Sequence, residues 1–460
     1  MNAPEFTPGQ RRTVILMVIA VITVFAMLTG FVVTSLQNWE TPLPATPQTF
    51  ASSPPTPTPP PLPSPSPSPM PEEGLWSQVQ AARLFDQIAH QVEVLRGLSP
   101  RAEVPLSFLD EHEMTVLLRQ LYTERDPEAR LSPYTTLGLL PDLPIYIRPH
   151  QPAGIYVPEQ RQLYIVTGPH ENSADAQALL ARAYARALQD QHFDLTAMDA
   201  RAATTDATLA IQSLVEGDTA LLMALYRHED LNKTDWDHLT ELALSAGQPS
   251  YGEKLDAVEA WTRLQRFPYW EGRRFTHDLL QIGGWEAVNQ AYTTPPRSTE
   301  QVLHPERYLE REDRPTEVMV PDLGTDLGEG WTKLRQDTLG EFVVGLYLDT
   351  VLPEEMSWQA AAGWDGDTLV VWERDEESRV LVWRTIWDSN ADAAEFERAL
   401  VAWIPQRHPP VRPADPPGPL SGQWWETDAG AMCVSRVARY VTLVQTPDVN
   451  TMANVVEIIP

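Results

Sequence analysis

The residue types that most often carry catalysis are sparse in this chain of 460 residues. Its one cysteine, Cys433, lies in the apolar run AMCVSRVARYVTLV, which predicts a buried and unreactive thiol. The glycine and serine patterns of phosphate-binding loops, dinucleotide-binding folds and serine hydrolases are absent. Glu111-His112-Glu113 begins like a zinc-binding HExxH helix, but Val116 stands where the second histidine is needed. We interpret these residues as the acidic first turn of a helix.

Two arginines form a more informative pattern. Arg182 and Arg186 lie four residues apart in ADAQALLARAYARALQDQ, a run of strong helix formers that begins after Asn172 or Ser173 as a candidate N-cap. That spacing places both side chains on one face of the predicted helix. From the spacing alone, we expect both arginines to lie on a face of the helix that is exposed to solvent.

The elements before this helix are two further helices and a small sheet. Apolar periodicity predicts helices over about 76–97 and 110–123. Short β-rich runs at 144–148, 154–157 and 163–166 predict strands, the last two joined as a hairpin by PEQRQ.

Several longer stretches carry a resemblance to a known family. They are AGIYVPEQRQLYIV (153–166), ALQDQHFDL (187–195), SLVEGDTALLM (213–223), RFPYWEGRRF (266–275), PPRSTEQVLHPERY (295–308) and AAAGWDGDTLVVW (360–372). Over about residues 75–460 the chain resembles bacterial membrane-anchored or exported zinc metallopeptidases of the HExxH class, which are gluzincin-like. The resemblance implies a helix-rich lobe with a small sheet around the metal site.

The resemblance also implies that the zinc site has been lost. The family's HExxH residues, two histidines with a glutamate between them, fall on Arg182, Ala183 and Arg186, while Glu216 matches the family's acidic third-ligand position. Arginine is always protonated and cannot ligate a cation, and alanine cannot accept a proton. We therefore expect no catalytic residue, no bound metal and no cofactor. A carboxylate left without zinc needs a cation, so we expect Arg182 and Arg186 to pair with Glu216, and Asp218 could join this cluster.

The N-terminal segment predicts a membrane anchor. Residues 13–36 contain no charged side chain and are long enough to cross a bilayer, and Arg11 and Arg12 before them predict a cytoplasmic N-terminus. The division is then a tail (1–12), a transmembrane helix (13–36), a Pro-rich stalk (37–74), a degenerate metallopeptidase-like lobe (75–336) and a C-terminal lobe (337–460). We expect a single-pass protein of the bacterial cell membrane whose body lies outside the cytoplasm. The formal net charge of −29 argues against nucleic acid as a partner.

The C-terminal lobe predicts an α+β module. Helices at 339–350, 391–403 and 448–459 alternate with strands at 368–373, 379–387, 421–426 and 431–445, which suits an antiparallel sheet covered by helices. The Asp-Gly in GWDGD (363–367) predicts a hairpin turn rather than a calcium loop.

Three functions follow from these patterns. The first is a pseudo-metallopeptidase that binds a peptide or protein in the former active-site cleft, with the peptide added as a strand along Leu163–Thr167. The second is a hydrolase with a different metal site around His192, Glu216 and His304, and the third is a structural envelope protein with a vestigial pocket. The candidate ligand-binding residues are Leu163, Tyr164, Ile165, His192, Asp194, Ser298, Glu300 and His304.

Overall fold

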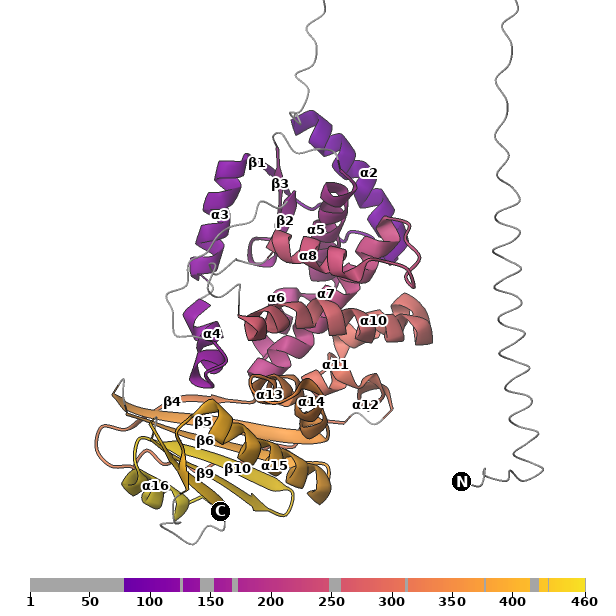
Figure 1. The fold of residues 1–460 in the computed structure, drawn as a ribbon. Coiled ribbons are helices and arrows are strands. Elements are labelled where there is room, and N and C mark those ends of the chain that lie inside the picture. The colour runs from indigo at the N-terminus through magenta and orange to yellow at the C-terminus, as the bar shows by residue number, and fades with distance from the viewer. Residues whose placement is uncertain are drawn as a thin grey trace, which may run out of the picture. The chain divides into compact units, whose positions relative to one another are not determined.

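The computed structural model describes residues 78–124, 127–140, 153–167, 173–247, 258–310, 313–375, 378–413, 422–428 and 430–459. The predicted tail, membrane helix and stalk, and the strand predicted at 144–148, lie outside the described residues. Residues 71–460 form one compact unit of α+β architecture. In Figure 1 its helical part and its large sheet lie against each other.

Helices dominate the first part of this unit. The periodicity of the sequence correctly predicts the first two helices and the helix that carries the arginine pair. The helices are α2 (Gln78–Arg96), α3 (Glu111–Glu124), α4 (Pro127–Thr136), α5 (Ala174–Phe193), α6 (Leu195–Arg201), α7 (Thr205–Tyr226), α8 (Trp236–Gly247), α10 (Glu259–Thr293), α11 (Thr299–Leu303) and α12 (Pro305–Leu309).

A three-stranded sheet lies beside α5. Strand β2 (Gly154–Val157) pairs antiparallel with β3 (Gln162–Val166) through the single 3₁₀ turn η1 (Pro158–Gln160), which confirms the predicted hairpin. The sequence did not reveal β1 (Leu106–Leu109), which pairs parallel with the other side of β3. Strand β3 is therefore the central strand, and the expectation that Leu163–Thr167 offers a free edge is wrong.

The two longest helices of the helical part, α7 and α10, meet at glycines. A Cβ atom built on Gly272 would lie 2.1 Å from the Ser213 carbonyl oxygen, and one on Gly217 would lie 2.1 Å from the Gly272 carbonyl oxygen. Only glycine permits so close an approach of two backbones. Helix α7 is long and apolar enough to cross a membrane, but most of it is buried inside the protein, as befits a core helix.

The C-terminal part is a seven-stranded antiparallel sheet in the order β4-β5-β6-β10-β9-β8-β7 (Figure 1). Alternate residues point to opposite faces, and both faces are covered. Leu369 and Val371 face a core with α13 and α15, whereas Val370 and Trp372 face a second core with α16. The elements are β4 (Thr332–Asp337), α13 (Gly340–Asp349), α14 (Glu354–Ala361), β5 (Trp364–Asp375), β6 (Ser378–Trp387), α15 (Asn390–Arg407), β7 (Arg412–Pro413), β8 (Gly422–Thr427), β9 (Gly430–Val437), β10 (Tyr440–Thr446) and α16 (Val449–Val456).

The predicted hairpin turn in GWDGD is wrong. Strand β5 already begins at Trp364, and its pairing with β6 is shifted between Trp364 and Gly366. A Cβ atom on Gly366 would lie 2.1 Å from the Thr316 carbonyl oxygen. The glycine therefore admits a neighbouring segment at a β-bulge instead of reversing the chain.

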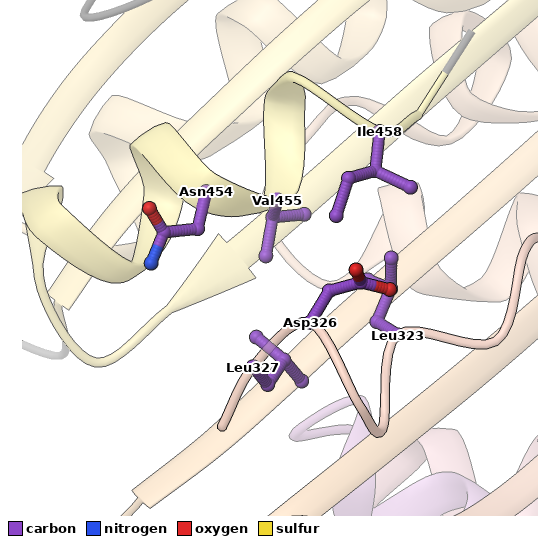
Figure 2. A pocket seen from close by; sticks show the side chains of 6 residues that line it. All are labelled: Leu323, Asp326, Leu327, Asn454, Val455 and Ile458. Carbon is purple, nitrogen blue, oxygen red and sulfur yellow. The ribbon is translucent and has the colours of Figure 1, made fainter.

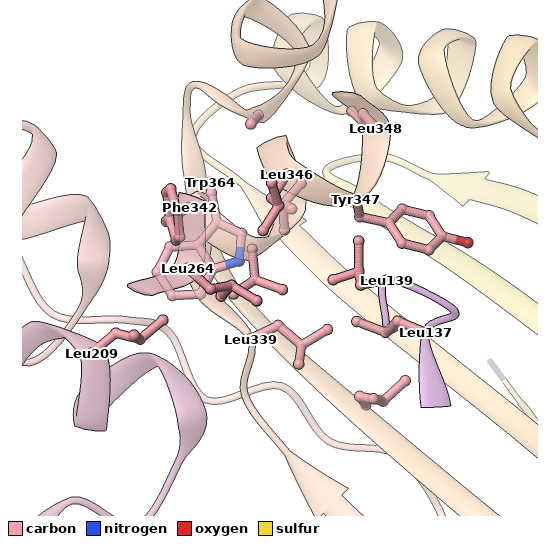
Figure 3. Close-up of a cluster of buried hydrophobic side chains, with 14 of the residues drawn as sticks. Leu137, Leu139, Leu209, Leu264, Leu339, Phe342, Leu346, Tyr347, Leu348 and Trp364 are labelled. Atoms are coloured by element: carbon pink, nitrogen blue, oxygen red, sulfur yellow. The ribbon is translucent and has the colours of Figure 1, made fainter. Parts of the chain in front are cut away.

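One apolar core joins the helical part to the sheet. Figure 3 shows Leu137, Leu209 and Leu264 from the helical part packed with Phe342 and Trp364 from the C-terminal part. These side chains are all at most 7 % exposed, so the boundary predicted at residues 336/337 crosses a continuous core.

The pocket in Figure 2 lies between the 323–327 segment and α16. Its lining is mainly aliphatic, with Asp326 and Asn454 as polar members, and it has no room for a water molecule. We assign this pocket to imperfect packing beneath α16 rather than to chemistry.

Candidate functional site

Helix α5 positions the arginine pair. Ser173 caps the helix by accepting a hydrogen bond from the Ala176 N–H at 3.1 Å, which confirms one of the two predicted N-caps. Ala183 is 2 % exposed and packs in the core between α5 and its neighbours. Arg182 and Arg186 both point toward Glu216 on α7. They therefore do not lie on the solvent-exposed face that their spacing alone favours.

Both arginines bind the same carboxylate. Arg182 Nη2 donates to Glu216 Oε2 at 2.7 Å, and Arg186 Nη1 donates to Glu216 Oε1 at 2.6 Å. Arg182 also contacts the Tyr269 hydroxyl at 3.3 Å, and Thr219 Oγ1 lies 3.4 Å from Glu216 Oε2. Arg182, Arg186 and Glu216 therefore form the expected ion pairs, and their origin from a metal site stays a prediction.

The electrostatics of this cluster favour its charged form. Burial would raise the pKa of the Glu216 carboxyl, but the Arg182 and Arg186 guanidinium groups outweigh that effect, and the pKa is lowered. Burial opposes the charge of Arg182 in the same way, yet Glu216 and Tyr269 raise its pKa. The side chains of Arg186 and Glu216 are 22 % and 13 % exposed, so the cluster reaches the surface on the Arg186 side.

Asp218 does not belong to this cluster, contrary to our expectation. Its carboxylate accepts from Arg96 Nε at 2.8 Å, from Arg96 Nη2 at 3.0 Å and from the Tyr292 hydroxyl at 2.7 Å. Two residues correspond to about 200° around a helix, so Asp218 faces away from Glu216 on α7. It forms a separate buried ion pair that joins α2, α7 and α10.

His192 and Asp194 have structural partners. His192 Nε2 lies 2.8 Å from the Ser99 carbonyl oxygen. Asp194 caps α6 by accepting a hydrogen bond from the Ala197 N–H at 3.0 Å, with its own φ at 56°. Neither residue contacts Glu216.

Ser298, Glu300 and His304 lie at another place in the molecule. Their segment contacts the start of α7, where Asp206 accepts hydrogen bonds from the Thr299 N–H and hydroxyl at 2.7 and 2.6 Å. Glu216 follows Asp206 by 216 − 206 = 10 residues, which is about 15 Å along a helix. The expectation that Ser298, Glu300 and His304 share one ligand-binding site with the arginine pair is therefore wrong.

Each of these three residues has a role at that second place. Ser298 caps α11 by accepting a hydrogen bond from Gln301. His304 lies 2.9 Å from Glu341, and this hydrogen bond raises the pKa of the imidazole. Glu300 is 1 % exposed, and its carboxylate lies 2.8 Å from Arg307 Nη1 without a hydrogen-bonding orientation. Burial raises the pKa of Glu300 to about 9.

Sequence reasoning missed two buried carboxylates in this second region, Asp206 and Asp367. Asp367 accepts hydrogen bonds from the Leu339 and Gly340 N–H groups at 3.0 Å each. Burial raises the pKa of Asp206 to about 7 and that of Asp367 to about 6. The Asp365-Gly366 pair beside Asp367 drew attention only as a possible turn, and Asp206 resembles an ordinary first-turn acid.

The donor set around Glu216 does not suit a metal. Guanidinium groups carry no free lone pair, and Ala183 has no side-chain donor. Within the described ranges, no group of three or more histidine, cysteine, aspartate and glutamate residues is arranged to hold a metal ion. Cys433 is fully buried, and burial raises the pKa of its thiol to about 12, as the prediction of an unreactive thiol requires.

Comparison with known proteins bears on the C-terminal part. Residues 330–456, from just before β4 to the end of α16, match the family model of a domain of unknown function, DUF8575. No curated protein and no solved structure matches the chain.

Proposed function

We propose that this protein is a non-catalytic relative of HExxH metallopeptidases that has exchanged its zinc for an arginine pair and acts by binding a peptide or protein. The observation that carries the proposal is the pairing of both Glu216 oxygens with Arg182 and Arg186, at 2.7 and 2.6 Å. A carboxylate that once ligated a dication would be left with buried, uncompensated charge, and two guanidinium groups supply the missing cations.

The proposed location is the outer face of a bacterial cell membrane. The uncharged run of residues 13–36 and the preceding Arg11 and Arg12 support an N-terminal anchor with the body exported. The acidic composition supports partners other than nucleic acid.

The ligand would bind at the surface over Arg186. Strand addition at β3 is not available, because β3 pairs with β1 and β2. Among the residues that the structure describes, Arg186 has one hydrogen-bonding partner, Glu216, and its side chain is 22 % exposed. Its unused N–H groups would donate to the carbonyl or carboxylate oxygens of a bound chain.

The alternative metal-dependent hydrolase has less support. It requires His192, Glu216 and His304 around one ion, yet these bind Ser99, the arginine pair and Glu341 respectively. A structural envelope protein with a vestigial site has more support, because Glu216 is already satisfied by residues of its own chain.

The zinc content of the purified protein tests the loss of the metal site. We would compare the wild type with a triple variant carrying Arg182→His, Ala183→Glu and Arg186→His, and with Arg182→Gln/Arg186→Gln as a control that removes charge without adding ligands. We expect stoichiometric zinc in the triple variant alone. Stoichiometric zinc in the wild type would overturn the proposal.

Peptide selection separates the binder from the vestigial protein. Random peptides would be selected on the wild type, counter-selected on Arg186→Ala, and the survivors titrated by calorimetry. Saturable binding that is lost in Arg186→Ala supports a binder. Selection that returns no such peptide favours the structural alternative.

A further inference from the structure

A second arginine-based feature lies on α10, apart from the Glu216 cluster. Arg266, Trp270 and Arg273 follow i, i+4, i+7 spacing and therefore lie on one face of the helix. The guanidinium carbon of Arg273 lies 4.5 Å from the ring centroid of Trp236, at the start of α8, and 5.3 Å from that of Trp270. Arg266 lies over the same Trp270 ring at 5.9 Å.

Arg273 differs from the other arginines of this helix in having no direct ion pair among the described residues. Arg263 binds Asp349 at 2.9 Å, Arg266 binds Glu241 at 2.8 Å, and Arg274 binds Glu271 at 2.7 Å. Arg273 makes no hydrogen bond or ion pair with any part of the chain that the structure describes. Its Nε is buried without a partner, whereas its terminal nitrogens are not among the buried unpartnered atoms and so reach solvent.

This environment leaves the guanidinium without a direct ion pair, and Glu271 attracts it only at longer range. Burial lowers the pKa of Arg273, but arginine remains protonated at any physiological pH. The indole rings attract the cation through their faces. A guanidinium carries its N–H donors at its edge, so the contacts with the rings leave these donors unused. Two edge N–H groups match the spacing of two oxygens on a carboxylate or phosphate.

We propose that Arg273, held by Trp236 and Trp270, is a binding site for a single oxyanion group, a carboxylate or a phosphate, on a small ligand. The site is independent of the function proposed for Glu216. The net charge of −29 disfavours a polyanion, because the surrounding surface repels extended negative charge, whereas one oxyanion meets the guanidinium at short range.

The structural alternative is that Arg273 only fastens α8 to α10 through its ring contacts. The two roles differ in their response to anions. Thermal unfolding of the full-length protein would be followed while inorganic phosphate or acetate replaces chloride at constant ionic strength. We expect a saturable rise in Tm with at least one of the two anions, because a ligand that binds only the folded state stabilises it.

Variants assign the response to one side chain. Arg273→Met keeps much of the packing against the indoles and should weaken the apparent affinity at least about tenfold, the effect of one lost charge-assisted contact. Arg398→Met is the control, because Arg398 is a 71 % exposed arginine paired with Glu395 on another helix, and it should retain the response. If Arg273→Met does not fold, Arg273→Lys keeps the charge without the two-pronged edge and should bind several-fold more weakly.

The outcomes separate cleanly. A response to phosphate alone assigns a phosphate-bearing ligand, and a response to acetate assigns a carboxylate. No saturable rise with either anion in the wild type, or an equal rise in the Arg273 variants, would overturn the proposal.

Discussion

At the scale of single residues, Glu216 stabilises the fold by balancing two arginines that would otherwise be buried without a counterion. Its side chain is 13 % exposed and accepts hydrogen bonds from Arg182 and Arg186. Removal of one partner from a buried ion pair costs about 3–5 kcal/mol, because the remaining charge stays in a poorly solvating environment. The charge of Glu216 therefore carries more stability than the exposed carboxylates of the surface.

The first prediction concerns Glu216→Gln. We expect the free energy of unfolding, measured by urea denaturation at pH 7, to fall by about 3 kcal/mol or more. Glu395→Gln is a suitable control, because Glu395 is 36 % exposed and its ion pair is with Arg398, which is 71 % exposed, and surface pairs contribute about 0–1 kcal/mol. Equal losses in both variants would mean that groups other than Glu216 balance the charges of Arg182 and Arg186.

At the scale of elements, the pair of Arg96 and Asp218 fastens α2 to the rest of the helical part. Both side chains are 1 % exposed, Arg96 also binds Asn289 at 2.8 Å, and Trp285 lies 4.3 Å from its guanidinium. The partners come from three helices, α2, α7 and α10, so the pair fixes their relative positions.

The second prediction is that Arg96→Met loosens α2. The variant leaves Asp218 buried with only the Tyr292 hydroxyl, so the free energy of unfolding should fall by about 3–5 kcal/mol. Hydrogen exchange should accelerate first in Gln78–Arg96. The double variant Arg96→Met/Asp218→Leu removes both charges and should regain part of the loss, whereas no recovery would point to packing instead of charge.

The third prediction concerns the contact of α7 with α10. An alanine in a helix is usually about 1 kcal/mol more favourable than a glycine. Gly272→Ala should nevertheless lower the free energy of unfolding by about 1–3 kcal/mol, because the new methyl group would meet the Ser213 carbonyl oxygen at 2.1 Å. A rise in Tm would show that the helices separate at little cost.

The sequence predicts most elements but not their neighbours. Periodicity locates α2, α3, α5 and the strands β2 and β3, because these depend on local residue order. The central position of β3 could not be predicted, because its second partner, β1, lies more than 50 residues upstream (163 − 106 = 57). The role of Gly366 depends in the same way on contact with Thr316, 366 − 316 = 50 residues before it.

The candidate site, too, could be predicted only where it depends on local residue order. Helical geometry turns Arg182 and Arg186 toward one face, and the acidic position at Glu216 supplies their partner. The same geometry argues against Asp218, which lies two residues further along α7. Its actual partner, Arg96, is 122 residues away and ends a helix that carries no other sign of function.

At the scale of the whole unit, buried carboxylates lie where the helical part meets the sheet. In the folded state the pKa values of Asp206, Asp367 and Glu300 are raised to about 7, 6 and 9, chiefly by burial. A carboxyl whose pKa is raised by folding binds its proton more tightly in the folded state. Its stabilising contribution is therefore complete below the unfolded pKa of about 4 and is lost as pH rises through the folded value.

The fourth prediction is a decline in stability between about pH 5 and pH 9. Tm should fall across this window, and Asp206→Asn, which keeps an acceptor oxygen for Thr299, should flatten the decline near pH 7. Glu300→Gln should flatten it at higher pH. A profile that rises steadily to pH 9 in the wild type would contradict the raised pKa values of these buried carboxyls.

The fifth prediction concerns the matched region as a separate fragment. Residues 330–456 include α13, whose Phe342 and Leu346 pack with Leu209 and Leu264 of the helical part (Figure 3). The isolated fragment would expose this apolar face, so we expect self-association in analytical ultracentrifugation. A stable monomer with cooperative unfolding would show that the sheet and its own helices form a sufficient core.

The shared core also sets an order of events during synthesis. Its members extend from Tyr134 to Leu443, so the ribosome has nearly finished the chain before the last of them appears. Until β9 and β10 emerge, the apolar faces of α7, α10 and α13 have no complete cover. The nascent protein therefore exposes these apolar faces for most of its translation, and ribosomal stalling late in the message should be more damaging than stalling at residues 37–74.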